Sequence, residues 1–213
     1  EKSLGVNPFK VGLIASTDGH NSISTPEEDN FFGKFPESEP SPERLENILA
    51  GRLWQNWRIV ASGYAAVWAR DNTREAIFDA MKRREVYATT GSRISVRFFG
   101  GWSYEAHDLH HANYLDKAYS QGVPMGGDLT AGPVGEAPSF IVLAVKDPEG
   151  ANLDRIQIIK GWLDDMGESH EKVYDVEWSK HRKQNPATGR LELVGNTVDT
   201  EAATFDNSIG ATQ

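Results

Sequence analysis

Three short apolar runs are the first elements that the pattern of hydrophobic and polar positions predicts. Val11–Ser16 is largely apolar over six residues, which is typical of a strand buried on both faces. Tyr64–Ala69 and Val86–Thr90 show a similar pattern, and a helix is predicted between them over Thr73–Arg84. A strand, helix and strand of this combined length match a parallel βαβ crossover. We therefore expect the three strands to be neighbours and mostly parallel, with the helix packed across them.

The predicted helix has a clear start signal in the sequence. Asn72 is placed to cap it, and Glu75 three residues later completes the pattern of a capping box. Ile77 and Ala80 recur at helical spacing, so their side of the helix is expected to face the strands. The basic run Lys82–Arg84 suits the negative C-terminal end of a helix.

After Gly91 the order of apolar and polar residues changes from continuous apolar runs to alternation. Ile94–Phe98 alternates apolar and polar residues, as a strand with one buried face does. Three further strands and one helix are predicted, over Phe140–Val145, Arg155–Lys160, Val173–Trp178 and residues 112–121. Short strands separated by turn sequences indicate a mainly antiparallel, β-rich module such as a β-sandwich. We therefore expect a domain boundary near residue 92, which separates residues 1–91 from residues 92–213.

Charge and composition narrow the partners of the protein. The chain has 31 acidic and 22 basic residues and a net charge of −9. Because phosphate contacts need clustered Lys and Arg, neither nucleic acid nor an anionic membrane surface is expected as a partner. The longest apolar run, Phe140–Val145, is too short to span a bilayer. The chain has no cysteine, which excludes disulfides and thiol catalysis within it.

The strongest candidate for chemistry is the pair Asp18 and His20. It lies in a polar stretch, Thr17–Ser22, directly after the predicted strand Val11–Ser16. Sites in α/β folds form at the carboxyl ends of strands, where this spacing places a carboxylate and an imidazole near one point. Such a pair suits a divalent metal ion such as zinc, manganese or iron. The alternative is an ordinary turn with a surface histidine.

Two other polar segments are weaker candidates. Thr89–Arg93 is predicted as a turn at a strand end, and its backbone amides together with the Arg93 guanidinium could hold a phosphate. The alternative is a strand turn with a solvent-facing arginine. His107 and His111 would share one face of a helix, but their polar flanks favour a solvated loop and helix start.

Several of these segments resemble a known superfamily. The motif STDGHNS at residues 16–22 resembles the last metal-ligand motif of the PHP (polymerase and histidinol phosphatase) superfamily. Residues 64–94 (YAAVWARDNTREAIFDAMKRREVYATTGSRI) resemble the final strand, helix and strand of its barrel. Later motifs resemble the β-rich tail of a bacterial family that also has a PHP-like barrel, namely RFFGGW, AYSQGVPMGGDL, KDPEGANLDRIQIIKGW, EKVYDVEW and VGNTVD.

The resemblance implies a distorted (β/α)7 barrel that holds up to three divalent ions and hydrolyses phosphate esters. Asp18 and His20 match the final ligand pair of that site. The early HxH motif and the middle Glu and His ligands have no counterpart in residues 1–213 and are expected upstream of Glu1. We therefore expect the C-terminal portion of a longer enzyme, also shortened at its C-terminal end. This chain alone is expected to bind metal weakly or not at all, and it supplies no catalytic residue.

Two functions remain open from the sequence. In the first, the chain is part of a metal-dependent phosphoester hydrolase for a small phosphorylated substrate, with Asp18 and His20 as ligands and Arg93 as a phosphate clamp. In the second, residues 92–213 form a non-catalytic binding or assembly module, and the metal motif is vestigial. An incomplete barrel would expose apolar faces, which predicts contact with a missing N-terminal half or self-association. The resemblance favours export in bacteria over a cytoplasmic location.

Overall fold

The computed structural model describes residues 4–22, 25, 34–39, 41–45, 48–49, 54–55, 59, 63–180, 182–199 and 201–213. Contacts divide the chain into two compact units. The central unit comprises Val11–Val142, and the terminal unit comprises Glu1–Lys10 with Leu143–Gln213. The domain boundary expected near residue 92 stays a prediction.

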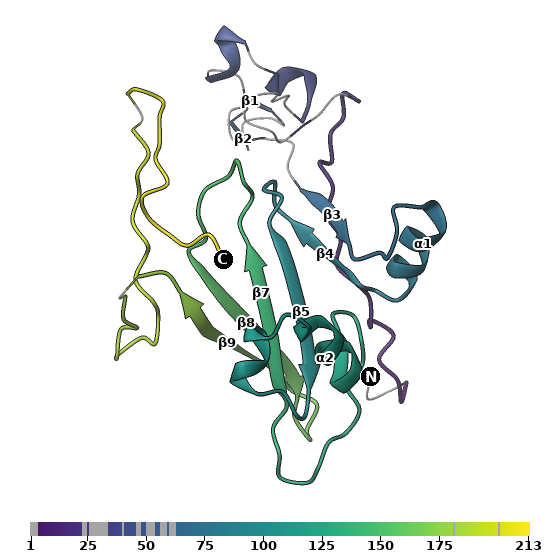
Figure 1. Cartoon of the computed structure of the whole chain (residues 1–213). Coiled ribbons are helices and arrows are strands. Elements are labelled where there is room, and N and C mark those ends of the chain that lie inside the picture. The colour runs from purple at the N-terminus through teal and green to yellow at the C-terminus, as the bar shows by residue number, and fades with distance from the viewer. Residues whose placement is uncertain are drawn as a thin grey trace. The chain divides into compact units, whose positions relative to one another are not determined.

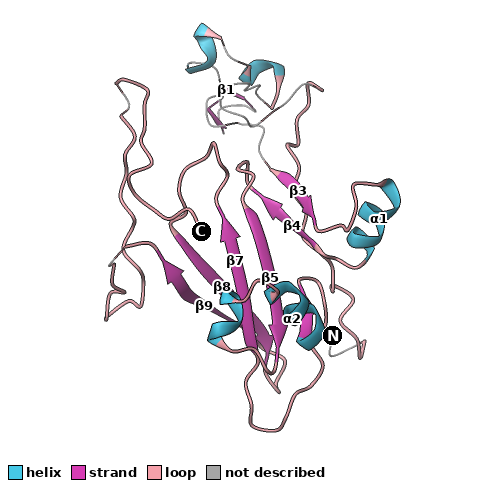
Figure 2. Cartoon of the chain, in the orientation of Figure 1, coloured by secondary structure: helices cyan, strands magenta, loops and turns pink. Residues whose placement is uncertain are grey.

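The chain has a mixed α/β structure with small antiparallel sheets (Figures 1 and 2). The central unit contains, in order, η2 (Pro36–Ser38), η3 (Pro42–Leu45), β1 (Ile48–Leu49), β2 (Trp54–Gln55), β3 (Tyr64–Val67), α1 (Arg74–Lys82), β4 (Val86–Thr89), β5 (Ser95–Gly101), η5 (Ala106–His110), α2 (Tyr114–Gln121), β6 (Gly122–Pro124) and the start of β7 (Ser139–Val145). The terminal unit contains β8 (Arg155–Leu163) and β9 (Ser169–Trp178).

The strands form separate small sheets. The pairs β1–β2, β3–β4 and β8–β9 are each antiparallel, and a further sheet has the order β6-β5-β7, with β5 and β6 antiparallel. Within the described part of the chain the strands form separate sheets and no barrel. The strands expected to belong to a barrel therefore do not form one there. No helix in the described ranges has both the length and the apolar character needed to cross a membrane.

The prediction of parallel strands around α1 is wrong, because β3 and β4 pair antiparallel. Val67 is the register partner of Val86, and the Trp68 amide donates a hydrogen bond to the Glu85 carbonyl at 3.0 Å. The chain therefore leaves β3, passes through α1 and enters β4 at the same end of the β3–β4 pair. A parallel crossover would have to carry the chain back to the opposite end of β3.

The return into β4 depends on the backbone of Arg84. Its φ of 64° is left-handed, which costs a residue with a side chain about 1–2 kcal/mol. The Arg84 amide donates to the Met81 carbonyl at 2.9 Å, and the Glu85 amide donates to the Ala80 carbonyl at 3.0 Å. These two bonds form a Schellman motif, which satisfies the last carbonyls of α1 and reverses the chain.

The helix begins one residue later than the sequence predicts. Thr73, not Asn72, is the N-cap: its backbone is extended, and its hydroxyl accepts a hydrogen bond from the Ala76 amide at 3.2 Å. The predicted capping box is therefore wrong, because Glu75 lies one position too early relative to this cap. Ala80 is fully buried and Ile77 is partly buried, which agrees with the predicted inward side.

The segment Val11–Ser16 does not form the predicted strand. Its side chains are also more open than expected, since Val11 is 71% and Leu13 is 74% exposed. The backbone nevertheless runs along the β3–β4 pair (Figure 1). A Cβ atom on Gly12 would lie 2.9 Å from the Val86 side chain, and one on Gly63 would lie 2.7 Å from the Ser16 carbonyl. The segment therefore runs from the beginning of β4 towards the beginning of β3.

The core of the central unit joins α2 to β5 and β7. Phe99, Tyr104, Ala118 and Ile141 form a buried cluster, and the Tyr104 hydroxyl donates to the Ala118 carbonyl at 2.5 Å. These contacts confirm the predicted helix at residues 112–121 and the strand at residues 140–145. They place the core on the side of β5 that α2 covers.

Asp108 is a fully buried carboxylate at the edge of this core. It accepts a hydrogen bond from the Glu105 amide at 2.8 Å and pairs with the Lys117 ammonium. Together these contacts hold the pKa of Asp108 below its usual value, with the backbone amide as the largest cause. The ionised carboxylate therefore fixes η5 against α2.

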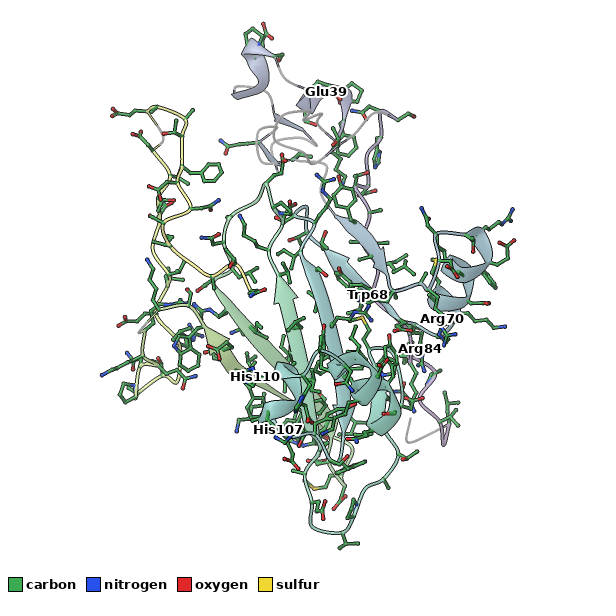
Figure 3. The ribbon with its side chains drawn as sticks, viewed as in Figure 1. Glu39, Trp68, Arg70, Arg84, His107 and His110 are labelled. Atoms are coloured by element: carbon green, nitrogen blue, oxygen red, sulfur yellow. The ribbon has the colours of Figure 1, made fainter. Side chains whose placement is uncertain are left out.

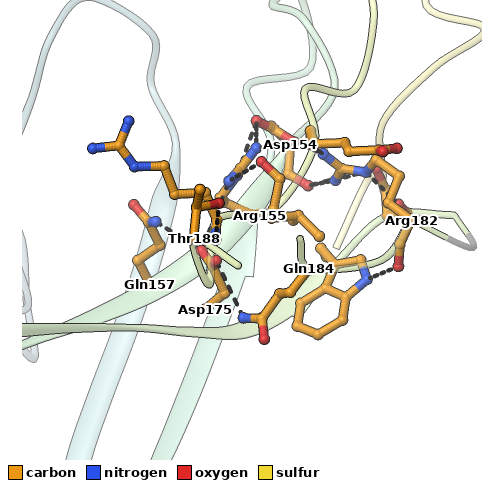
Figure 4. A network of polar contacts seen from close by, with 12 residues as sticks. Asp154, Arg155, Gln157, Asp175, Arg182, Gln184 and Thr188 are labelled. Atoms are coloured by element: carbon orange, nitrogen blue, oxygen red, sulfur yellow. Dashed lines mark hydrogen bonds and ion pairs between the residues drawn. The ribbon is translucent and has the colours of Figure 1, made fainter. Parts of the chain in front are cut away.

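In the terminal unit, a polar network anchors the chain that follows β9 (Figure 4). Arg182 donates to the carbonyls of Ser179 and Glu192, each at 2.9 Å, and its guanidinium pairs with the Asp154 carboxylate. Arg155 also pairs with Asp154 and donates to the Glu192 carbonyl at 3.1 Å. The guanidinium groups of Arg155 and Arg182 thus donate hydrogen bonds to backbone carbonyls that lie outside the strand pairing.

Gly126 offers a direct test of the close approach to Arg84. Its φ is 79°, and a Cβ atom there would overlap the carbonyl oxygen of Arg84. Gly126→Ala should therefore lower the free energy of unfolding by about 3 kcal/mol in urea denaturation. Gly135 is the matched control, because its φ is 86° but no atom lies within 4 Å of its Cβ position. Gly135→Ala should cost about 1 kcal/mol. Equal losses would contradict the packing of this turn on Arg84.

Candidate functional site

Asp18 and His20 lie side by side in the loop after Ser16. Asp18 has a left-handed backbone with φ 50°, a conformation that Asp tolerates better than most residues. The Asp18 Oδ1 atom is 3.4 Å from the His20 Nε2 atom. Their side chains are 66% and 50% exposed, so the pair is open to solvent. The loop thus brings together the carboxylate and the imidazole as the sequence predicts.

The imidazole is positioned by the segment before η2. The His20 amide donates to the Lys34 carbonyl at 2.7 Å, and the His20 ring lies 4.4 Å from the Phe35 ring at an angle of 56°. Phe35 is itself fixed, because its amide donates to the Ser38 hydroxyl at 2.9 Å and Ser38 is fully buried. The ring of His20 is therefore held by contacts that leave its Nε2 atom facing Asp18.

Lys34 is the main cause of a lowered pKa at Asp18. Its ammonium pairs with Asp18 Oδ2, while Oδ1 faces His20. This hydrogen bond and charge lower the pKa of Asp18 below its ordinary value, and the contact with His20 contributes less. Asp18 is therefore an ionised carboxylate at neutral pH, with one oxygen bonded to Lys34 and one directed at the imidazole.

The separation within the pair fits a shared metal ion. Zinc binds carboxylate oxygen and imidazole nitrogen at about 2.0–2.2 Å, and at a tetrahedral angle two such atoms are about 3.4 Å apart. Asp18 Oδ1 and His20 Nε2 are 3.4 Å apart. Catalytic zinc sites take three protein ligands. Among the residues that the structure describes, no group of three or more His, Asp or Glu side chains could hold a metal ion.

The turn that contains Arg93 lies at the same end of the β3–β4 pair as this loop. Thr89 ends β4 as the register partner of Tyr64, and Gly63, next to Tyr64, contacts Ser16. Arg93 is exposed and lies four residues after Thr89. The antiparallel pairing therefore places the two predicted segments at the same sheet end.

Thr89 is an unusual residue at this sheet end. Its side chain is buried at 8% exposure, and its hydroxyl oxygen has no hydrogen-bond partner among the described residues. Leaving a buried hydroxyl unpaired costs about 1–3 kcal/mol. The buried, unpaired hydroxyl of Thr89 thus lies at the C-terminal end of β4, just before the turn. The sequence pattern did not predict this burial.

The histidine cluster on η5 is a separate feature. His107 and His110 lie away from Glu39 in Figure 3, whereas the Glu39 carboxylate accepts a hydrogen bond from Asn21 beside the candidate loop. His107 contacts Glu105 at 3.2 Å and the ring of His111 at 5.5 Å. The predicted helix start is confirmed here as a short 3-10 helix, and it supplies no residue to the site.

The remaining histidines do not join the candidate site either. His170 contacts Asp164 at 2.9 Å within the terminal unit, and His181 lies outside the described residues. The residues that sequence reasoning missed are Lys34 and Phe35. They lie in a long proline-containing segment whose pattern does not indicate which side chains turn back towards Asp18.

Replacing Lys34 tests the electrostatic part of this site. In Lys34→Ala the pKa of Asp18 should rise towards its ordinary value, because the neighbouring ammonium is gone. A carboxyl titration followed by NMR measures this. In the parent, the stabilisation from the pair is present above the unfolded-state pKa and is lost as pH falls through the lowered pKa. Lys82→Ala, on α1, is the control, and an unchanged Asp18 titration in Lys34→Ala would contradict the pairing.

Comparison with known families gives one match. The family described as "Protein of unknown function (DUF3604)" matches residues 1–213. No curated protein and no solved structure matches the chain. The description names no activity and no link to the PHP superfamily, so that resemblance stays a prediction. Because the match covers the whole sequence given, the chain belongs to the DUF3604 family.

Proposed function

We propose that the chain supplies Asp18 and His20 as two ligands of a divalent metal site for phosphoester hydrolysis. The observation that carries this proposal is the 3.4 Å separation between Asp18 Oδ1 and His20 Nε2 in an open loop. The separation suits a tetrahedral ion, and the donor set of one carboxylate and one imidazole suits zinc, manganese or iron.

Each residue has a defined task in this proposal. A bound ion would polarise the phosphoryl group and lower the pKa of a bound water. Lys34 holds Oδ2 of Asp18 and so leaves Oδ1 as the ligand atom, as hydrogen bonds to ligating carboxylates do at metal sites. Phe35 fixes the ring of His20, which must be neutral at Nε2 to bind an ion.

Arg93 is proposed to bind the phosphate group of the substrate. Its planar guanidinium can donate two parallel hydrogen bonds to phosphate oxygens. Its turn lies at the same sheet end as the Asp18 loop, which is the placement that this task requires. The third ligand and any second ion would depend on residues outside the described ranges.

The experiment uses the natural protein that contains residues 1–213. Metal content is measured after purification, and hydrolysis of p-nitrophenyl phosphate and bis-p-nitrophenyl phosphate is measured with manganese, zinc or iron. Asp18→Asn and His20→Ala should each lower hydrolysis about a hundredfold or more and reduce bound metal, with only the small change in melting temperature that loss of an exposed contact causes. Asp71→Asn and His110→Ala are the matched controls, because both replace exposed residues outside the site.

Arg93→Lys separates phosphate binding from metal binding. It keeps the charge but loses the bidentate geometry, so kcat/KM should fall about tenfold while metal content stays constant. A protein that remains free of metal and inactive under all three ions would contradict the proposed function. The binding or assembly function of residues 92–213 would then be the better explanation.

A further inference from the structure

The hairpin β8–β9 presents a regular face of aromatic and basic side chains. In its register Trp162 lies opposite His170, Lys160 opposite Lys172, and Ile158 opposite Tyr174. Because side chains alternate between the two faces of a hairpin, these pairs share one face. We call Lys160, Trp162, His170, Lys172 and Tyr174 the aromatic–basic face.

Two lysines directly opposite one another are an unfavourable pair. Like charges at opposed positions repel across an antiparallel ladder. Within the described ranges, neither Lys160 nor Lys172 forms an ion pair with a carboxylate. Each ammonium instead lies over a ring, 4.9 Å from the centroid of Trp162 for Lys160 and 4.7 Å from that of Tyr174 for Lys172. An anionic group between the lysines would remove their repulsion.

The aromatic rings of this face are accessible and held in place. Trp162 is 39% exposed and Tyr174 is 38% exposed. The ring of Trp162 stacks on His170 at 5.3 Å and 23°, and His170 Nε2 contacts Asp164 at 2.9 Å. These contacts reduce the entropy that the Trp162 ring would lose when a ligand packs on it.

We propose that the aromatic–basic face binds an anionic polysaccharide. Tyr174 is the register partner of Ile158, which lies four residues from Trp162 along β8. At about 3.4 Å per residue, the two aromatic residues are therefore about 14 Å apart along the hairpin. The lysine pair lies between them. A sugar chain that packs ring faces on the two aromatic side chains would thus place a sulfate or carboxylate group against the two ammonium groups.

The charge balance favours a glycan over a nucleic acid. The chain has a net charge of −9, so a polymer with one phosphate on every unit meets long-range repulsion that two lysines do not offset. A polysaccharide with a charge on only some of its units needs few cations. The aromatic rings then supply the apolar part of the contact. This inference is independent of the proposed metal site, which belongs to other residues.

The experiment measures binding of the 213-residue chain by titration calorimetry. The probes are hyaluronan, with a carboxylate on every second sugar, and sparsely carboxymethylated dextran as anionic glycans, unmodified dextran as a neutral glycan, and single-stranded oligo-dT. The parent should bind both anionic glycans, with affinity that falls as salt increases, and should bind dextran and oligo-dT at least about tenfold more weakly.

Variants locate the contact on this face. Lys160→Ala with Lys172→Ala, and separately Trp162→Ala, should each weaken binding of the anionic glycans about tenfold or more. Lys160→Arg with Lys172→Arg should retain it. The matched controls are Lys82→Ala with Lys183→Ala, which removes the same charge elsewhere, and Ile159→Thr on the other face of β8.

Several outcomes would overturn the proposal. These are equal binding of dextran, tighter binding of oligo-dT, full binding by the Lys160 and Lys172 double Ala variant, and the absence of binding to either anionic glycan. Circular dichroism of each variant shows whether the secondary structure of the chain as a whole is retained. If Trp162→Ala unfolds, the double Arg and double Ala variants at the lysines still decide the outcome.

Discussion

The left-handed backbone of Arg84 is the constraint on which the arrangement of the central unit depends. It closes α1 with a Schellman motif and sends the chain straight into β4 beside the end of β3. Because β4 then runs antiparallel to β3, Thr89 ends next to Tyr64, at the sheet end that Ser16 reaches. The loop with Asp18 and the turn with Arg93 therefore follow segments that reach the same end of the β3–β4 pair.

The two proposed binding sites differ in how their charged groups are paired. At Asp18, the Lys34 ammonium pairs with one carboxylate oxygen and lowers the pKa of the group, and the other oxygen faces His20. At the β8–β9 hairpin, Lys160 and Lys172 face each other with aromatic rings beside them. We propose a cation at the Asp18 oxygen that faces His20 and an anion between the two lysines. The arrangement on the hairpin depends on strand register, since a shift of one residue would separate the two lysines.

Parts of this arrangement can be predicted from the sequence, because they depend on local patterns. Alternation and turn residues predict β5, β7, β8 and β9, and the spacing of Asp18 and His20 predicts their proximity. The direction of β4 cannot be predicted in this way. A strand, helix and strand of this length fit a parallel crossover equally well, and only the hydrogen bonds around Arg84 decide between them.

Contacts between distant segments are the other part that local patterns do not encode. The apolar residues of Val11–Ser16 predicted a buried strand. Burial depends, however, on which other segments cover these residues, and Leu13 is 74% exposed. Similarly, no local pattern links Lys34 to Asp18. The pairing depends on how the segment before η2 folds back, as the hydrogen bond from His20 to the Lys34 carbonyl shows.

The most direct test of the central claim is paramagnetic NMR with Mn²⁺ added to the natural protein that contains residues 1–213. If Asp18 and His20 form a metal-binding pair beside the end of β4, the amide signals of Gly19 and His20 should broaden first. Those of Gly91 and Arg93 should follow, and Asp18→Asn should abolish both effects. Broadening that leaves these four amides unaffected, or that persists in Asp18→Asn, would contradict the account.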